Sequence, residues 1–172
     1  LLARHPGLVL DVSGTSSAAR LSRGEADLAL RLSRPQEKGL VARKLGVLAY
    51  GLYGARAYVE ATPEAARTFL GYDEELAHSP QQVWLEAMAK GRPIVFMSND
   101  LSSLVPAARA GMGLAAVPHA LGRTAEDLVC VAEGAGAKRD LWLLVHPDLR
   151  RAARVRAVMD HIIAECRDLN TP

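Results

Sequence analysis

The chain has little of what several protein classes depend on, beginning with cysteine. Cys130 and Cys166 are its two cysteines, with no CxxC spacing and no histidine pair near either. This pattern argues against a disulfide-rich scaffold and against a zinc ribbon. We expect both residues to be reduced, half-buried thiols in a reducing compartment, and a disulfide between them is the remaining alternative.

Long apolar runs and an excess of one charge are also missing. No stretch approaches the roughly 20 apolar residues of a membrane span. The chain has 21 Lys and Arg against 19 Asp and Glu, and a net charge of +2 is too weak to favour nucleic-acid binding by this segment. Its 172 residues, 49% hydrophobic and 23% charged, suit one globular domain or two small lobes. We therefore expect a cytoplasmic protein without membrane contact.

Motifs for catalysis and metal binding are missing as well. No serine lies in a GxSxG elbow, and no cysteine and histidine are spaced as a nucleophile and its base. The histidines show no HExxH or i, i+4 pairing. They are scattered along the chain as His5, His78, His119, His146 and His161. The sequence predicts no enzyme, no catalytic residue, no cofactor and no metal site.

What the chain does contain is a strand–turn–helix–strand pattern near its start. Apolar residues alternate over 8–12 as in a strand, and the small and hydroxyl residues of 13–17 follow. A short helix over about 17–23 and a strand over 27–32 complete a βαβ unit. A turn of Gly, Ser and Thr at the carboxyl end of a parallel strand is where open α/β sheets bind ligands.

Strand-like and helical segments alternate along the rest of the chain. We expect further strands over 40–53, 93–97, 114–117, 128–132 and 141–145, and helices over 56–70, 81–90, 101–110 and 149–167. Residues 134–138 look like a flexible glycine-containing loop. This alternation predicts the α/β class with mostly parallel sheets.

Two long strands, near 40–53 and 141–146, follow polar loops and look able to cross between lobes. Two crossovers give two lobes with a cleft between them. We therefore place lobe I at 1–45 plus 143–172 and lobe II at 46–142.

Several motifs occur in an order that is more specific than any one of them. The strand at 27–32 reads DLALRL, 110–118 reads AGMGLAAVP, 141–147 reads LWLLVHP, and 151–160 reads RAARVRAVMD. In this order and spacing the chain resembles the effector-binding (substrate-binding) domain of a LysR-type transcriptional regulator, truncated at its N-terminus. The resemblance covers essentially the whole chain.

The resemblance implies a two-lobed, type II periplasmic-binding-protein-like fold, with two mostly parallel sheets flanked by helices and joined by two crossover strands. It implies a ligand-sensing domain that binds a small, anionic metabolite in the interlobe cleft. It also implies a homodimer or homotetramer, with DNA contacted through an N-terminal domain absent from this chain. The family's first strand and most of its first effector-domain helix are expected upstream of Leu1.

Candidate ligand-binding residues lie in one turn of each expected lobe. In lobe I they are Ser13, Thr15 and Ser16, and by the resemblance Thr15 aligns with a pocket threonine. A helix N-terminus attracts anions, although hydroxyls there also serve as plain helix caps. The matching turn of lobe II consists of Ser98, Asn99 and Asp100, for which a cap is again the alternative.

Two further candidates lie on strands. Arg31 ends a strand and could pair with a carboxylate of the ligand, or lie on the surface, or pair with Asp27 or Glu25. Tyr53 is either a pocket wall or an ordinary core tyrosine.

Some prominent residues have simpler interpretations. We expect Trp84 and Trp142 to be packing residues, and the arginines at 150, 151 and 154 to form a solvated helix face.

Two other classes of protein remain open. A periplasmic solute-binding protein of a transporter shares the lobed fold and would need a signal peptide upstream. An enzyme on the same fold, such as a transferase, would need a nucleophile or an acid–base pair in the cleft, and the sequence offers none.

Overall fold

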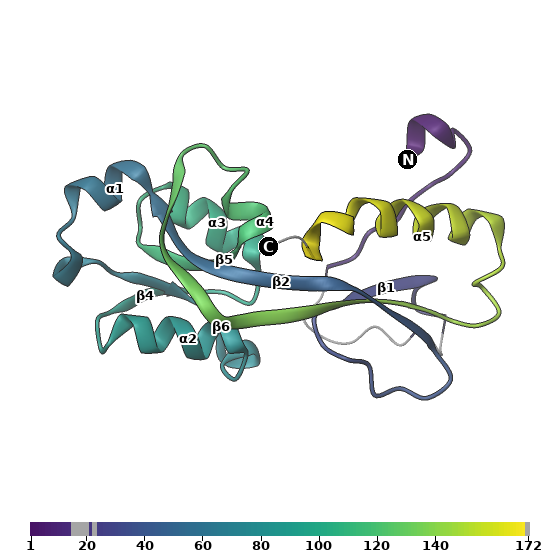
Figure 1. Ribbon diagram of the computed structural model, residues 1–172, viewed down its shortest axis with the longest axis horizontal. Helices are drawn as coiled ribbons and strands as arrows, with labels where there is room; N and C mark the ends of the chain where they lie inside the picture. The colour runs from purple at the N-terminus through teal and green to yellow at the C-terminus, as the bar shows by residue number, and fades with distance from the viewer. Residues whose placement is uncertain (15–20, 22–23, 171–172) are drawn as a thin grey trace. The chain divides into compact units, whose positions relative to one another are not determined.

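The computed structural model describes residues 1–14, 21 and 24–170 (Figure 1). Chain contacts divide it into two compact units. Unit 1 comprises Leu1–Val47 and Asp140–Pro172, and unit 2 comprises Leu48–Arg139. The boundaries expected from the sequence were 45/46 and 142/143, and the assignment of functional lobes stays a prediction.

Six strands form one hydrogen-bonded order, β1-β6-β2-β5-β3-β4. Their bounds are β1 Leu28–Arg31, β2 Val41–Ala55, β3 Phe69–Gly71, β4 Ile94–Met97, β5 Leu114–Pro118 and β6 Leu128–Val145. The two long strands, β2 and β6, each contribute residues to both units. The first crossing lies in the strand expected near 40–53, whereas the second falls at 139/140 of β6, just before the strand expected at 141–146.

The helices are short except for the last one. Their bounds are α1 Arg56–Ala61, α2 Pro80–Ala89, α3 Leu101–Arg109, α4 His119–Gly122 and α5 Ala153–Glu165. Single 3-10 turns lie at Leu2–Arg4, Glu64–Ala66, Glu74–Leu76 and Arg167–Asn170. No helix among the described residues is long and apolar enough to cross a lipid bilayer.

The α/β class is confirmed, but the six strands form one mixed sheet, whereas two mostly parallel sheets were expected. β3 runs parallel to β4 and to β5, whereas β2 and β5 are antiparallel, and so are β1 and β6. Parallel pairing requires a crossover between strands, and α2 and α3 supply it between β3, β4 and β5. The two long strands are not linked to their neighbours by such helices, so they are free to pair in the antiparallel direction.

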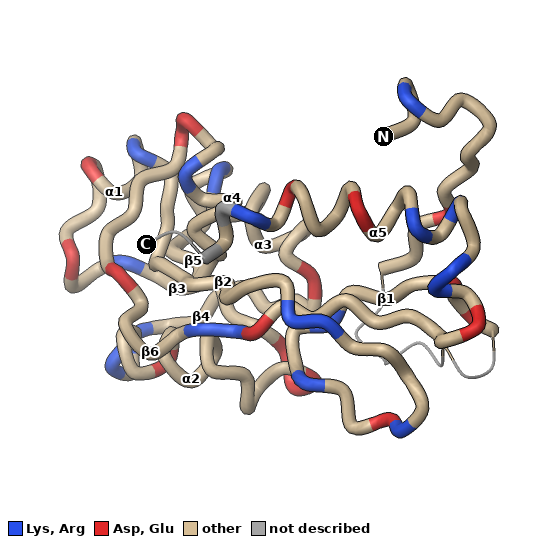
Figure 2. Tube along the Cα trace, turned by 45° about the vertical axis from the view of Figure 1, so that its right-hand side comes forward, with Lys and Arg blue, Asp and Glu red and all other residues tan. Residues whose placement is uncertain are grey.

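In unit 2 the core lies around β3 and β5, between α2 and α3. Figures 1 and 2 show these two helices on opposite sides of the strands. Phe69 and Leu70 of β3, Leu85 of α2 and Leu104 of α3 are all fully buried. Trp84 of α2 is half-buried against this cluster, as expected for a packing residue.

In unit 1, β1 pairs with the end of β6 so that Arg31 lies opposite Trp142 and Leu30 opposite Leu143. Helix α5 begins at Ala153, later than the predicted 149. The preceding residues form turns, with Leu149 N–H bonded to the His146 carbonyl at 3.1 Å. The chain therefore turns after Pro147 before the helix starts.

The structure corrects three expected elements. Residues 8–12 form no strand, and Val9 and Val12 are 89% and 86% exposed. A segment with alternating apolar residues is not stabilised as a strand unless it pairs with a neighbouring strand. The helix expected over 56–70 ends at Ala61, since the residue before Pro63 is disfavoured in helical geometry, and 69–71 is strand instead.

The third correction concerns the loop expected over 134–138. These residues continue β6. Gly134 packs so closely on β2 that a Cβ there would lie 2.5 Å from the Tyr50 carbonyl oxygen. Glycine is needed for this close approach rather than for a loop.

Candidate functional site

The parallel strands β3 and β4 end at Gly71 and Met97, and the turns that follow them adjoin. The Ser98 N–H donates to the Gly71 carbonyl at 3.1 Å, which ties the two turns together. Ligands of open α/β sheets bind at the carboxyl ends of such strands. This edge of unit 2 is therefore the natural place to look for a binding site.

The turn at 98–100 caps α3. The Ser102 N–H donates to Asp100 Oδ1 at 2.8 Å, and the Ser102 hydroxyl also donates to this carboxylate. Both hydrogen bonds from Ser102 hold the pKa of Asp100 below its usual range, and the bond from the Ser102 hydroxyl contributes more than the bond from its N–H. The Asn99 amide donates to Glu75 Oε2 at 3.3 Å. The expected helix cap is confirmed, and an ionised carboxylate at this N-terminus disfavours a second anion beside it.

A buried amide follows β3. Gln82, in the first turn of α2, accepts a hydrogen bond from the Tyr72 N–H at 2.7 Å and donates to Glu86 Oε1 at 2.7 Å. Its neighbour Gln81 accepts from Arg139 Nη1 at 3.5 Å. Both glutamines are at most 2% exposed. Buried glutamines are uncommon, and here they tie β3, α2 and β6 together.

Beside these amides two buried hydroxyls have no hydrogen-bond partner among the described residues. They are Tyr50 Oη, on β2, and Ser79 Oγ, just before α2. Tyr72 Oη, in contrast, donates to the Ala116 carbonyl at 3.1 Å. Burial raises the pKa of Tyr50, while the nearby Arg139 guanidinium partly offsets this effect.

We call these residues the tyrosine–glutamine cluster; its members are Tyr50, Tyr72, Ser79, Gln81, Gln82 and Arg139. Almost all buried polar atoms in proteins find a partner, so each of the two orphaned hydroxyls calls for an explanation. Together with Arg139, they offer donors that a small oxygen-rich molecule would use, whereas the Gln82 amide is already engaged at both ends.

The site residues expected from the sequence lie in both units. In unit 1, Ser13 is exposed and lies outside any helix or strand, and Thr15 and Ser16 fall outside the described residues, as does the helix expected there. Arg31 is largely buried, with 14% of its side chain exposed, and pairs with Glu37 at 3.4 Å. Tyr53 is 2% exposed and shares a hydrogen bond of 2.7 Å with His119 Nδ1. Ligand contact by any of these residues stays a prediction.

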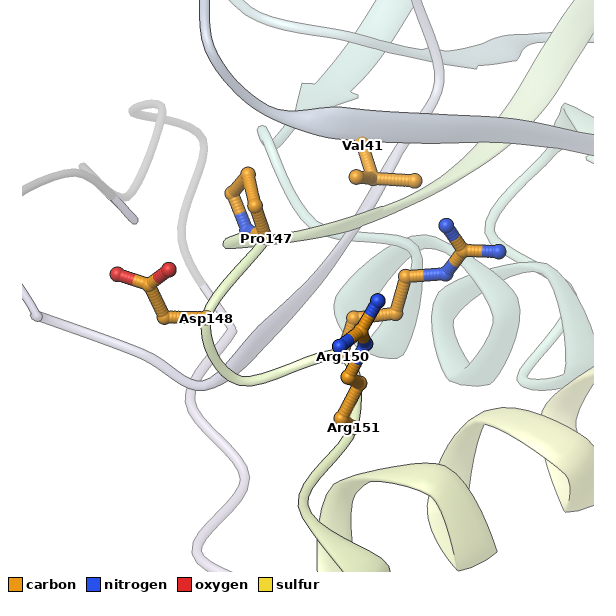
Figure 3. Close-up of a pocket in the computed structure, with 5 residues that line it drawn as sticks. All are labelled: Val41, Pro147, Asp148, Arg150 and Arg151. Carbon is orange, nitrogen blue, oxygen red and sulfur yellow. The ribbon is translucent and has the colours of Figure 1, made fainter.

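A shallow hollow of about 510 Å³ lies in unit 1 (Figure 3). Val41, Pro147, Asp148, Arg150 and Arg151 line it, and Asp148 points away from the two arginines. Both arginines are exposed and precede α5 rather than lying on it. The hollow has the character of a solvated surface, as the sequence suggested for these arginines.

Sequence reasoning missed most of the tyrosine–glutamine cluster. One available signal was the alternation of β2, which puts Tyr50 and Tyr53 on opposite faces of the strand. Another was the pair of adjacent amides, Gln81 and Gln82, at the start of the helix expected over 81–90. Nothing in the sequence marked Arg139 as their neighbour, because 58 residues separate it from Gln81.

Comparison with known proteins shows similarity along almost the whole chain. The family model described as the LysR substrate binding domain matches residues 1–167. The Mau operon transcriptional activator of Paracoccus denitrificans is 27% identical over 173 residues, which cover 98% of this chain and 57% of that protein. The chain thus spans little more than half the length of this relative.

Solved structures show the same fold. The regulatory domain of CrgA, a LysR-type transcriptional regulator from Neisseria meningitidis, has a TM-score of 0.75 at 21% identity, covering 96% of this chain and 87% of that one. The effector domain of the transcriptional regulator AmpR of Pseudomonas aeruginosa has a TM-score of 0.69 at 18% identity, with coverages of 96% and 84%. These likenesses confirm the expected type II periplasmic-binding-like fold.

Proposed function

The chain belongs to the LysR substrate binding domain family, and from this premise we propose that it is the ligand-sensing part of a transcriptional regulator. In this proposal it binds a small anionic metabolite reversibly and carries out no catalysis. The whole protein acts in the cytoplasm as a homodimer or homotetramer and contacts DNA through an N-terminal domain. The similarity to a transcriptional activator supports this assignment.

The observation that carries the ligand proposal is the orphaned Tyr50 hydroxyl beside Arg139. A carboxylate or phosphate oxygen placed there would accept from the hydroxyl and lie close to the guanidinium charge. Ser79 Oγ, at the N-terminal end of the ten-residue helix α2, supplies a second unused hydroxyl. The positive end of that helix dipole also favours a negatively charged group.

Ligand binding can be signalled to the rest of the protein through a shift between two conformations. A ligand shifts a conformational equilibrium by as much as its affinities for the two conformations differ. Hydrogen-bond donors that are unpaired in the free protein can give the two conformations different affinities for the ligand. The conformation that aligns these donors with the ligand gains the hydrogen bonds and binds more tightly. The unit 1 residues Ser13, Thr15, Ser16 and Arg31 are proposed as further contacts. So is the turn at 98–100, where Asp100 would accept from a hydroxyl or ammonium group of the ligand rather than face its anionic group.

The proposal is tested by titrating carboxylate- and phosphate-bearing metabolites into the 172-residue chain and measuring heat by calorimetry. For a compound that binds, Tyr50→Phe should weaken affinity about 10- to 150-fold, since a hydrogen bond to a charged group contributes about 1.5–3 kcal/mol. Tyr58→Phe is the matched control, because its hydroxyl contacts Thr68 elsewhere in unit 2. If Tyr50→Phe and Tyr58→Phe bind the compound with equal affinity, the tyrosine–glutamine cluster is not its binding site.

A second comparison tests the unit 1 turn. Thr15→Ala should also weaken binding of the same compound, and unchanged affinity would remove this turn from the site. If no metabolite in a broad screen binds the wild-type chain, the ligand-sensing proposal itself is wrong for this chain.

A further inference from the structure

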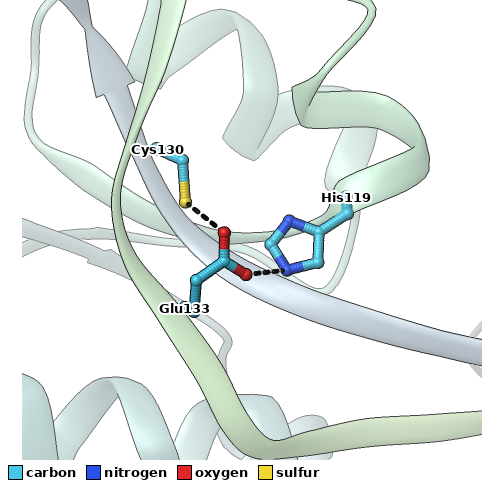
Figure 4. A group of neighbouring side chains, drawn as sticks. All are labelled: His119, Cys130 and Glu133. Atoms are coloured by element: carbon cyan, nitrogen blue, oxygen red, sulfur yellow. Dashed lines mark hydrogen bonds and ion pairs between the residues drawn. The ribbon is translucent and has the colours of Figure 1, made fainter. Parts of the chain in front are cut away.

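Three side chains with metal-binding atoms converge in unit 2, and none of them belongs to the tyrosine–glutamine cluster (Figure 4). His119 is the first residue of α4, directly after β5, and Cys130 and Glu133 belong to β6. His119 Nε2 lies 2.8 Å from Glu133 Oε2, and Cys130 Sγ lies 3.7 Å from Glu133 Oε1. The three ligand atoms all lie within 4.8 Å of one another.

A glycine makes this convergence possible. Gly51 on β2 lies under the group, and a Cβ there would be 2.6 Å from His119 Cε1 and 2.9 Å from Cys130 Sγ. Any larger residue would push the imidazole and the thiol out of place. A second glycine, Gly122, makes room for the Tyr53 ring, which a Cβ would approach within 2.3 Å.

Tyr53 orients the histidine. Its hydroxyl is 2.7 Å from His119 Nδ1, so the other ring nitrogen, Nε2, faces Glu133. Burial raises the pKa of the Cys130 thiol, and the interaction of this thiol with the same hydroxyl offsets a small part of that effect. Arg123 also hydrogen-bonds to this hydroxyl. Metal-binding histidines usually have their second nitrogen fixed in such a way.

An ordinary surface ion pair would explain less of this arrangement. The Glu133 side chain is 67% exposed, and an exposed ion pair stabilises a protein by at most about 1 kcal/mol. Such a pair needs neither a thiol on the same carboxylate nor a glycine beneath it. It also needs no buried tyrosine to fix which imidazole nitrogen faces outward.

We propose that His119, Cys130 and Glu133 form a three-residue binding site for a divalent transition-metal ion, with zinc as the cation that the donors favour. Zinc takes imidazole nitrogen, thiolate sulfur and carboxylate oxygen at about 2.0–2.3 Å, which places tetrahedral donors roughly 3.3–3.8 Å apart. The present distances come within reach of this geometry through side-chain rotation. Calcium and magnesium prefer all-oxygen ligands and are not expected to bind.

Binding exchanges protons for the metal ion. The thiol of Cys130 releases its proton to solvent and binds as thiolate, and Nε2 of His119 binds in its unprotonated form. His119 Nδ1 then donates to Tyr53 Oη, and that hydroxyl donates to the thiolate. Cys130 and Glu133 are exposed, so the fourth position faces solvent and can take water or an external ligand.

The site is tested by titrating zinc into the reduced 172-residue chain in competition with a chromophoric chelator. We expect one zinc ion per chain with a dissociation constant below about 10 μM. Cobalt in place of zinc should give the near-ultraviolet charge-transfer absorption of a thiolate–cobalt bond. Weaker zinc binding than this limit, or cobalt spectra without that absorption, would overturn the proposal.

Variants assign the ligands. Cys130→Ser should abolish the cobalt–thiolate absorption and weaken zinc binding at least 10-fold, whereas the control Cys166→Ser should leave both unchanged. Tyr53→Phe keeps all three ligands and should weaken binding about 10- to 100-fold, the usual cost of losing an orienting partner. Circular dichroism establishes that each variant is folded. Zinc affinity unaffected by Cys130→Ser in a folded chain would contradict the site.

Discussion

The Gln82 side chain is the hydrogen-bond acceptor of a main-chain N–H that lies outside the strands and helices. Its side-chain oxygen accepts from the Tyr72 N–H, just beyond the end of β3, and its amide nitrogen donates to Glu86. Both ends of a fully buried amide are therefore occupied. Interactions of this kind are costly to remove singly, because the partner that remains is buried and unsatisfied.

We predict that Gln82→Met destabilises the chain by about 1–3 kcal/mol, since methionine keeps the length of the side chain but leaves the Tyr72 N–H without an acceptor. Urea unfolding followed by circular dichroism measures this loss. The control is Gln36→Met, at an exposed position of unit 1. Equal stability of the two variants would mean that the Tyr72 N–H finds another acceptor.

Tyr53 gives a prediction about alkaline pH. Burial, as the largest cause, raises the pKa of Tyr53 from 10.0 to about 12. The folded state therefore holds the phenolic proton more tightly than the unfolded state. This stabilisation is complete below pH 10 and is lost as the pH rises from 10 to about 12.

Tyr53→Phe should accordingly lose less stability than the wild type across this pH range. Urea unfolding at a series of pH values, with a chelator present to exclude metal effects, gives the two slopes. Parallel slopes would show that Tyr53 ionises equally in both states.

At the level of single residues, contacts between sequence neighbours could be predicted better than contacts between residues far apart in the sequence. Asp100 as a cap follows from a polar residue just before an apolar helical stripe. The contact between Tyr53 and His119 joins residues 66 positions apart, and no local pattern encodes it. The scattered histidines suggested no metal site, because the histidine of the proposed site lies on a different segment from the cysteine and the glutamate and no known spacing motif joins them.

Among the elements, α2 couples the tyrosine–glutamine cluster to the core. Leu85 is fully buried against the strands of unit 2, while Val83 on the same helix is 54% exposed. The first turn of α2 holds Gln81 and Gln82, so the packing of this helix fixes the position of both amides. Loss of that packing should lower the free energy of unfolding.

We predict that Leu85→Ala lowers the free energy of unfolding by about 2–5 kcal/mol, through lost burial and the cavity that remains. Val83→Ala, the control on the exposed face, should change it by less than about 0.5 kcal/mol. Both values come from urea unfolding monitored by circular dichroism. Similar losses for the two variants would contradict the assigned buried face of α2.

Elements with a strong period were predictable, and elements decided by neighbours were not. The apolar stripe of α3 and the continuous apolar runs of β4 and β5 each appear close to where the sequence placed them. The alternating residues 8–12 had the right pattern for a strand but no partner, and residues 134–138 had a loop-like composition but pair within β6. Local composition carries no information about which partner is present.

At the scale of the whole molecule, the order of motifs was the strongest signal in the sequence. It identified the family, which the family model then confirmed over residues 1–167. The direction of strand pairing could not be derived in this way, because the two long strands pair with segments distant in sequence. Charge is likewise distributed over the molecule, with basic and acidic residues interspersed along the trace (Figure 2).

This charge distribution predicts weak contact between the chain and DNA. With 21 basic against 19 acidic residues, the 172-residue chain should bind a labelled duplex only weakly at low salt, and the complex should be lost near physiological salt. Fluorescence anisotropy at two salt concentrations measures this, with a helix-turn-helix protein of known DNA affinity as the positive control. Sequence-specific binding at physiological salt would contradict a purely sensory role for this part of the protein.

The two tryptophans give the molecule a property that neither composition nor fold class conveys. Trp142 lies on the part of β6 that belongs to unit 1, and Trp84 lies on α2 in unit 2. Each unit therefore carries one intrinsic fluorophore, and replacing either indole with phenylalanine leaves an emission signal from the other unit alone. Trp84 lies two residues from Gln82, so in a Trp142→Phe chain its fluorescence reports on the neighbourhood of the proposed ligand. In a Trp84→Phe chain, Trp142 reports on unit 1, where it lies opposite Arg31.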